Sequence, residues 1–214
     1  MHKVLPVGLF ATVTLALGFW LLADHRPRSA YASSIQTECD NKEAINQLDR
    51  YSACEKYIEK LGDDADHRLL SHAYYNMANA IGQTVKPSGV DAFYRILTEA
   101  ESIAIDLSII HMRKALSIGP IDIAIPIYYI EYFYYLALSK QFSSIVEIMK
   151  DVNMRNVLEY SNFFDVFLYY EYRSNLELGH LEDAELVCAE IIQKYPNSGQ
   201  VDCLREMLEK RAAQ

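Results

Sequence analysis

The chain has 214 residues, of which 51% are hydrophobic, and it carries a formal net charge of −9 at pH 7. A chain of this length can bury one hydrophobic core and does not require a second domain. Its excess of acidic residues argues against nucleic acids and against anionic lipid surfaces as partners.

An apolar segment opens the chain, from Val4 to Ala23, without a charged residue and directly after Lys3. About 20 helical residues can cross a hydrocarbon core of about 30 Å, as a membrane anchor does. A signal peptide instead combines a positive start, an apolar stretch and an A-x-A cleavage site, which Ala30-Tyr31-Ala32 fits. Residues 1–32 are therefore expected to be a cleaved signal peptide or an uncleaved anchor. A buried core helix is the third interpretation.

Both leading interpretations place the rest of the chain outside the cytoplasm, in the periplasm or secreted. An uncleaved segment over residues 4–23 would tether it to the inner membrane. The four cysteines are consistent with a location outside the cytoplasm, because an even number of thiols in an exported chain usually forms disulfides. Cys39 and Cys54 are 15 residues apart, and so are Cys188 and Cys203. No C-x-x-C occurs, which argues against a thioredoxin-type redox site and a zinc knuckle. The alternative is four buried free thiols in a cytosolic protein.

Beyond the leader, apolar residues recur at helical spacing and strand-like alternation is nearly absent, which predicts an all-α protein. The β-branched and aromatic run over residues 121–135 could be a strand, but its length and its continuation into Leu136 favour a buried helix. Connections are short, so neighbouring helices should be antiparallel. The expected helices cover residues 42–47, 52–61, 66–83, 90–100, 101–117, 121–139, 142–149, 162–178, 181–194 and 200–211.

Helix, short turn and helix recur, a pattern typical of stacked helical pairs. Residues 178–197 resemble the second half of a tetratricopeptide repeat. In that family a glycine ends the first helix, a small residue permits close packing and a proline ends the second helix. Gly179, Ala184 and Pro196 match that spacing, and each residue type suits its role physically. The interval from residue 140 to residue 179 is 39 residues, however, where the family's period is about 34.

A second match is residues 73–80, which resemble the first helix of such a repeat, with Tyr74 in the large aromatic position and Ala78 in the small one. The resemblance implies a degenerate tetratricopeptide-like α-solenoid of stacked antiparallel helix pairs over residues 39–214. Residues 33–38 are expected to form a short tether. An irregular helical bundle is the alternative.

The expected helices can be tested against the cysteine spacing. The turn near Pro196 places Cys188 and Cys203 at nearly the same height of an antiparallel hairpin, within reach of a disulfide. One continuous helix from Cys39 to Cys54 would separate them by about 22 Å, so that bond requires a break. We expect both disulfides, with the break near residues 48–50 and Cys39 in a flexible start.

The sequence offers little catalytic chemistry. It contains no G-x-S-x-G, H-E-x-x-H, Walker A or G-x-G-x-x-G motif. His67 and His72 are five residues apart, which does not match the i, i+4 spacing of a helical metal pair. His111 lies in an apolar stretch and is expected to be packed, while Glu99 and Glu101 are expected to be solvated or capping groups. We therefore expect no catalytic residue, no metal site and no cofactor.

The resemblance implies a groove for extended peptides or partner helices, lined by the first helix of each pair. Asparagine can donate to and accept from a peptide backbone, and tyrosine is common at interfaces. The alternative is that these tyrosines fill the core between helices. The expected groove residues are Tyr75, Asn76 and Asn79 on one pair, Ile130, Glu131 and Tyr134 on the next, and Tyr169, Tyr170 and Arg173 on the last.

These expectations favour a non-enzymatic, extracytoplasmic scaffold that binds another protein or peptide during envelope assembly, secretion or quality control. Contact with a membrane is expected only through the leader, if it is uncleaved. An oligomerising structural subunit is the alternative, followed by an enzyme of unrecognised type with its site in the groove.

Overall fold

The computed structural model describes residues 30–43, 46–62, 65–85, 91–119, 124–198 and 203. This described part is all-helical and contains no strand, which confirms the prediction of an all-α protein. Its helices are α2 (Ala30–Asp40), α3 (Gln47–Leu61), α4 (His67–Gln83), α5 (Glu99–Ile118), α6 (Ile125–Leu138), α7 (Phe142–Lys150), α8 (Val152–Glu159), α9 (Phe164–Glu177) and α10 (Leu181–Lys194).

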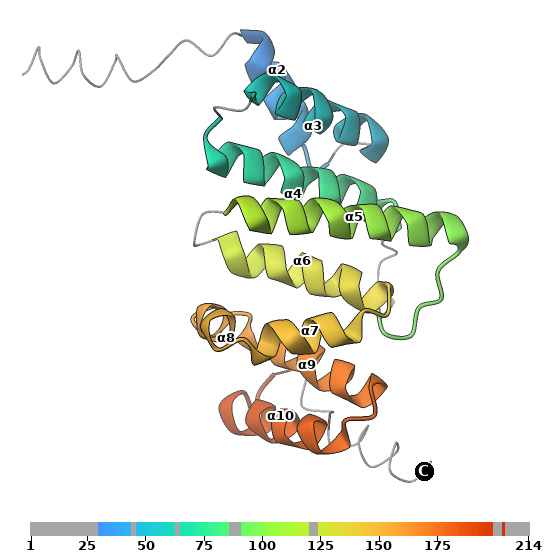
Figure 1. Cartoon of the computed structure of the whole chain (residues 1–214), viewed down its shortest axis with the longest axis vertical. Coiled ribbons are helices and arrows are strands. Elements are labelled where there is room, and N and C mark those ends of the chain that lie inside the picture. The colour runs from blue at the N-terminus through green and yellow to red at the C-terminus, as the bar shows by residue number, and fades with distance from the viewer. Residues whose placement is uncertain are drawn as a thin grey trace, which may run out of the picture.

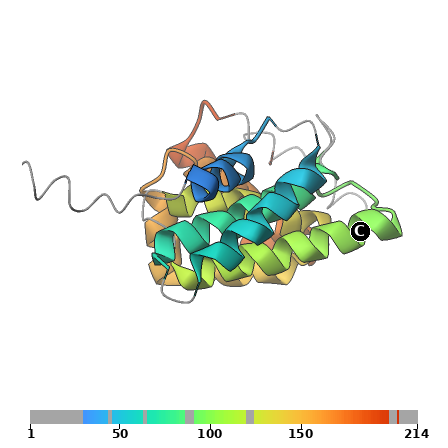
Figure 2. The same ribbon diagram turned by 90° about the horizontal axis from the view of Figure 1, so that it is seen from above.

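From α2 to α7, consecutive helices lie one below another, with α8 beside α7 and with α9 and α10 at the lower end (Figure 1). Each of the pairs α2–α3, α3–α4, α4–α5, α5–α6 and α9–α10 is in contact. Further contacts join helices that are not neighbours in the chain: α2 with α4, α4 with α6, and α6 with α9. Seen from above, α2 and α3 lie over part of the helices below them (Figure 2). Of the helices that carry the predicted groove residues, α4 therefore adjoins α6, and α6 adjoins α9.

The buried side chains form two clusters. The larger runs from α4 to α10 and is centred on aromatic residues such as Phe133, Phe167 and Tyr172, none of which is exposed. The smaller joins α2, α3 and α4, and contains Ile35 and Met77 together with the first cysteine pair. Ile35 is 5% exposed, and residues 33–38 lie within α2. The prediction that these residues form a tether is therefore wrong, because they are helical and Ile35 packs on the next two helices.

Both predicted disulfides are present. Cys39 and Cys54 are bonded with a Cα–Cα distance of 4.7 Å, and Cys188 and Cys203 with one of 5.9 Å. The break that permits the first bond lies between Asp40 and Gln47, earlier than residues 48–50. Cys39 stands in the last turn of α2 instead of in a flexible start, so the bond joins two helices.

Residues 91–98 also differ from the prediction, because they are not helical and α5 begins only at Glu99. The Phe93 ring is buried, with its centroid 5.6 Å from that of Phe142 and 5.7 Å from that of Tyr170. Lys140 Nζ donates to the Phe93 carbonyl at 2.5 Å. Contacts with distant helices thus hold the segment in a non-helical conformation, although the spacing of its own apolar residues favours a helix.

Local signals set the other helix ends. Thr98 and Glu101 form a reciprocal capping box at the start of α5, which confirms the capping role expected for Glu101. Gly179, just beyond α9, has φ of 77°, a conformation that glycine adopts without strain. This confirms the predicted end of that helix. The eight-residue α8 was not predicted, and Asp151 starts it by accepting a hydrogen bond from the Met154 amide.

The predicted signal peptide or anchor lies almost wholly outside the described residues, as does nearly all of the helix expected over 200–211. Of the latter, only Cys203 is described, and it is helical. None of the described helices is both long enough and apolar enough to cross a membrane. Two disulfides are typical of an oxidising compartment outside the cytoplasm.

Candidate binding surface

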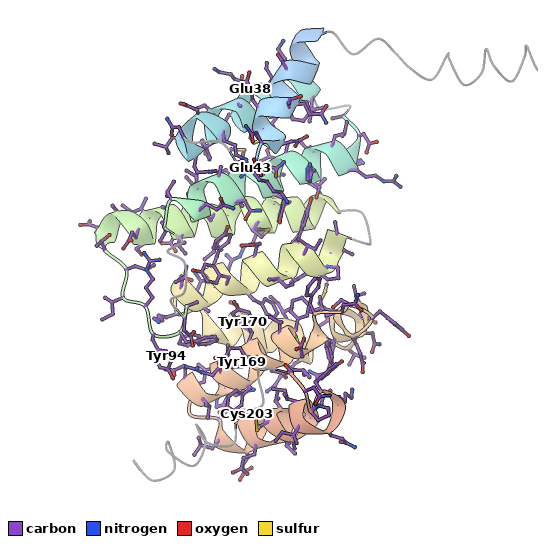
Figure 3. The ribbon with its side chains drawn as sticks, turned by 180° about the vertical axis from the view of Figure 1, so that it is seen from behind. Glu38, Glu43, Tyr94, Tyr169, Tyr170 and Cys203 are labelled. Atoms are coloured by element: carbon purple, nitrogen blue, oxygen red, sulfur yellow. A yellow bond between two sulfur atoms is a disulfide. The ribbon has the colours of Figure 1, made fainter. Side chains whose placement is uncertain are left out.

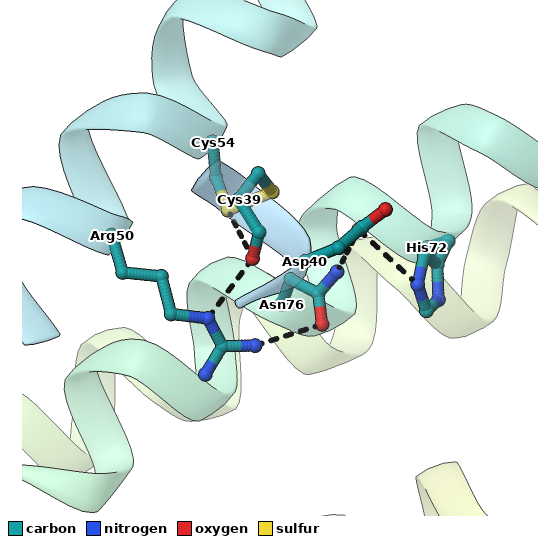
Figure 4. The surroundings of a disulfide bond; sticks show 6 residues. All are labelled: Cys39, Asp40, Arg50, Cys54, His72 and Asn76. Atoms are coloured by element: carbon teal, nitrogen blue, oxygen red, sulfur yellow. Dashed lines mark hydrogen bonds and ion pairs between the residues drawn. A yellow bond between two sulfur atoms is a disulfide. The ribbon is translucent and has the colours of Figure 1, made fainter. Parts of the chain in front are cut away.

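Asn76, expected to face a groove, is fully buried where α2, α3 and α4 meet (Figure 4). Its Oδ1 accepts from Arg50 Nη2 at 3.0 Å, and its Nδ2 donates to Asp40 Oδ1 at 2.8 Å. Arg50 Nε also donates to the Cys39 carbonyl at 2.9 Å. The groove prediction is therefore wrong for Asn76, because the helices on either side enclose its amide and use both of its ends.

Tyr75 and Asn79 hold α4 against α6 and are each only 4% exposed. The Tyr75 ring stacks on Tyr128, with centroids 4.0 Å apart. Asn79 Oδ1 accepts from the buried Tyr135 hydroxyl at 2.8 Å, and burial raises the pKa of Tyr135 well above its usual value. A Cβ at Gly82 would overlap the Tyr135 ring, so glycine permits this close approach. The two predicted groove residues are therefore structural, and that prediction is corrected.

Arg173 is 2% exposed because residues 91–94 cover it. Its guanidinium carbon lies 4.8 Å from the centroid of the Phe93 ring and 4.5 Å from that of Tyr94. Its Nη1 is 3.4 Å from Asp91 Oδ2 and donates to the Tyr169 hydroxyl at 3.0 Å. Arg173 therefore anchors the chain's own segment to α9, which corrects its assignment to an open groove.

The remaining predicted groove residues are partly exposed: Ile130, Glu131, Tyr134, Tyr169 and Tyr170. Burial raises the pKa of Tyr170, and the charge of Glu131 adds to that shift. Figure 3 shows Tyr169 and Tyr170 close to the segment that carries Tyr94. Residues 91–94 thus lie against Tyr169 and Tyr170, and contact of these partly exposed residues with a partner stays a prediction.

A more exposed apolar surface lies around α8. We call Ile127, Val157, Tyr160 and Phe163 the α8 apolar patch. Their exposed fractions are 46%, 39%, 94% and 43%, respectively. These side chains line a pocket of about 380 Å³ together with Pro126, Ser161 and Asn162. Several large apolar side chains exposed together commonly mark an interaction site. The sequence prediction missed this patch because it missed α8, although Asp151 is a residue type that commonly starts a helix.

A second pocket, of about 370 Å³, lies between α6, α7 and α8, and we call it the acidic pocket. Its walls combine aromatic, apolar and acidic side chains: Tyr129, Tyr132, Ser144, Glu147, Ile148, Asp151 and Met154. Burial, with smaller contributions from Tyr132 and Asp151, raises the pKa of Tyr129 to about 12. The Tyr129 hydroxyl therefore stays neutral at physiological pH, and the formal charges on the lining are those of the two carboxylates.

Ion pairs fix α8 to α9 and α10. Arg155 Nη1 lies 2.7 Å from Glu171 Oε2, and Arg155 Nη2 lies 2.5 Å from Glu190 Oε2. Lys194 pairs with Glu159 at 2.7 Å and with Glu190 at 3.0 Å. Burial raises the pKa of Glu171, although the pairing with Arg155 opposes this shift. These ion pairs therefore hold α8, which forms a wall of both pockets, against α9 and α10.

His111 is packed as expected. Its Nε2 lies 3.1 Å from the Tyr51 hydroxyl, its ring stacks beside Tyr74, and burial lowers its pKa. Among the residues that the structure describes, no group of three or more histidine, cysteine or acidic side chains is placed to hold a metal ion. Compared with known proteins, the chain matches no family model, no curated protein and no solved structure.

Proposed function

We propose that this protein is a non-enzymatic, extracytoplasmic scaffold that binds another protein through the surface around α8. The observation that carries the proposal is the α8 apolar patch, in which four large side chains from α6, α8 and the turn before α9 are exposed around one pocket. Apolar side chains that are exposed together around one pocket are typical of a surface that contacts a partner.

The placement outside the cytoplasm is supported by the two disulfides and by the apolar leader of the sequence. All four cysteines are at most 1% exposed, so the bonds act as structural staples near the two ends of the described chain. A role in envelope assembly, secretion or quality control fits such an exported scaffold. The net charge of −9 weighs against nucleic acid as the partner.

We further propose that the helices form a degenerate tetratricopeptide-like solenoid. Its support is the set of contacts from α2 through α4 and α6 to α9, together with the buried Ala184 at the α9–α10 approach. The extra helix α8 falls inside the interval from residue 140 to residue 179, which is longer than the family's period. On this interpretation α8 is an insertion into a repeat, and the insertion carries the binding surface.

The test compares partner capture by two variants from envelope extract of the native cell. Tyr160→Glu places a charge on the patch at a side chain that is 94% exposed, so the fold should not change. Leu186→Glu makes the same change on α10, at a side chain that is 71% exposed and outside the patch. We expect Tyr160→Glu to lose a partner that the wild type and Leu186→Glu retain. Equal capture by all three would refute the proposal.

An oligomerising subunit is a second candidate, because the same patch could meet a second copy of the chain. Light scattering separates the two possibilities. A wild-type protein that is oligomeric, with a monomeric Tyr160→Glu variant, would favour the oligomer.

A further inference from the structure

We infer that the partner segment bound beside α8 is both basic and apolar. A lysine or arginine side chain would enter the acidic pocket, and an aliphatic or aromatic side chain would enter the pocket of the α8 apolar patch. This inference rests on the proposed function and names the chemistry of the partner.

The two pockets are neighbours, because both take lining residues from α6 and from α8 or its end. Met154 lines the acidic pocket, whereas Val157 and Tyr160 line the apolar one. At 1.5 Å per residue, Met154 lies about 4.5 Å from Val157 and about 9 Å from Tyr160 along the helix axis. Side chains four apart on a partner helix are spaced by about 6 Å, so one short segment can reach both pockets.

The charges on the lining select a cation. Glu147 and Asp151 are both exposed, and neither forms an ion pair within the described part of the chain. The cations nearest in the chain are already engaged: Lys150 lies 3.3 Å from Asp183, and Arg155 is held by the ion pairs to α9 and α10. The acidic pocket therefore contains two carboxylates that form no ion pair within the described part of the chain and can bind a cation of a partner.

The aromatic walls favour the same ligand. The Tyr129 and Tyr132 rings meet at 60° with their centroids 6.2 Å apart, and both line the acidic pocket. Arg113 Nε donates to the Tyr132 hydroxyl at 2.7 Å, which fixes that wall from the side of α5. A guanidinium or ammonium group gains from aromatic faces and from carboxylates at once, whereas a phosphate group would be repelled.

The probe is a labelled twelve-residue helical peptide with arginine and leucine repeated at i, i+4 spacing on one face. The matched peptide carries citrulline, which keeps the shape of arginine without its charge. The full chain is held in neutral-lipid nanodiscs, which accommodate the leader and do not attract a basic peptide. Fluorescence anisotropy gives the dissociation constants.

The protein variant is Glu147→Gln combined with Asp151→Asn. Asparagine keeps a side-chain oxygen to cap α8, so the helix should persist. Glu99→Gln with Asp106→Asn is the control, since it removes two exposed carboxylates from α5 and changes the net charge equally.

We expect the arginine peptide to bind the Glu147 and Asp151 double variant about tenfold more weakly than the wild type. The reason is that the variant loses two partly solvated ion pairs with the peptide. The control variant should bind that peptide as the wild type does, and the citrulline peptide should not distinguish the three proteins. Unchanged affinity of the double variant, equal loss in the control, or equally tight citrulline binding would overturn the inference. Any of these outcomes, with partner capture through Tyr160 intact, would leave the proposed function standing.

Discussion

Replacing Asn76 by alanine should destabilise the fold strongly, although the sequence suggested that this side chain faces a partner. The change removes the acceptor of Arg50 Nη2 and the donor to Asp40. The Arg50 side chain is 2% exposed, and its Nη1 already has no hydrogen-bond partner within the described part of the chain. A second unpaired donor on a buried cation cannot be satisfied by water without opening the junction of α2, α3 and α4.

The magnitude follows from these contacts. Leaving a buried charged donor unpaired costs about 1–3 kcal/mol, and the small cavity adds roughly 1 kcal/mol. A loss of about 3 kcal/mol is a large part of a typical stability of about 5–15 kcal/mol. It should lower the melting temperature by about 6–12 °C for a domain of this size.

The assay is urea unfolding of the oxidised protein, followed by far-ultraviolet circular dichroism. Asn156→Ala is the matched control, because this asparagine is exposed on α8 and its loss should change stability by no more than about 0.5 kcal/mol. If Asn76→Ala unfolds at the wild-type midpoint, the amide does not support Arg50, and the structural role assigned to it is refuted.

Three further predictions concern packing, the second disulfide and pH. Gly82→Ala should destabilise the fold by about 1–3 kcal/mol in urea unfolding, because its Cβ would overlap the Tyr135 ring; a stable variant would contradict that close approach. Replacing Cys188 and Cys203 together by serine should cost about 3 kcal/mol through the lost cross-link over 15 residues, and an unchanged melting temperature would count against it. Because burial raises the folded-state pKa of Glu171 above its usual value, the fold binds that proton more tightly than the unfolded chain. The contribution of this group to stability is therefore present at low pH and is lost as pH rises through the raised pKa. Glu171→Gln should flatten that part of the pH dependence of the urea midpoint, whereas an unchanged profile would show that another group causes it.

Features that depend on nearby residues could be predicted from the sequence. Gly179 ends a helix through its own backbone freedom, and the spacing of Cys188 and Cys203 about a short turn specifies their bond. The capping box of Thr98 and Glu101 is also local, since it joins residues three apart.

Features that depend on distant residues could not be predicted. Asn76 is buried by Asp40 and Arg50, which lie 36 and 26 residues away in the chain. Residues 91–98 have apolar side chains at helical spacing, yet they are not helical, because the Phe93 ring packs against Phe142 of α7 and Tyr170 of α9.

The sequence did not predict α8, for a different reason. It has eight residues, of which only Leu158 is buried, so its apolar pattern is weak. Ion pairs with α9 and α10 hold it in place, and single-sequence periodicity contains no sign of them. The candidate binding surface was missed because it is built on this helix.

Photo-crosslinking in the intact cell tests the central claim most directly. A photoreactive residue replaces Tyr160, directly after α8, in one variant and the exposed Lys56 on α3 in another, and the products are identified by mass spectrometry. The scaffold proposal requires one dominant protein partner outside the cytoplasm, crosslinked from position 160 and absent from position 56. No crosslinked protein at position 160, or the same products from both positions, would contradict it.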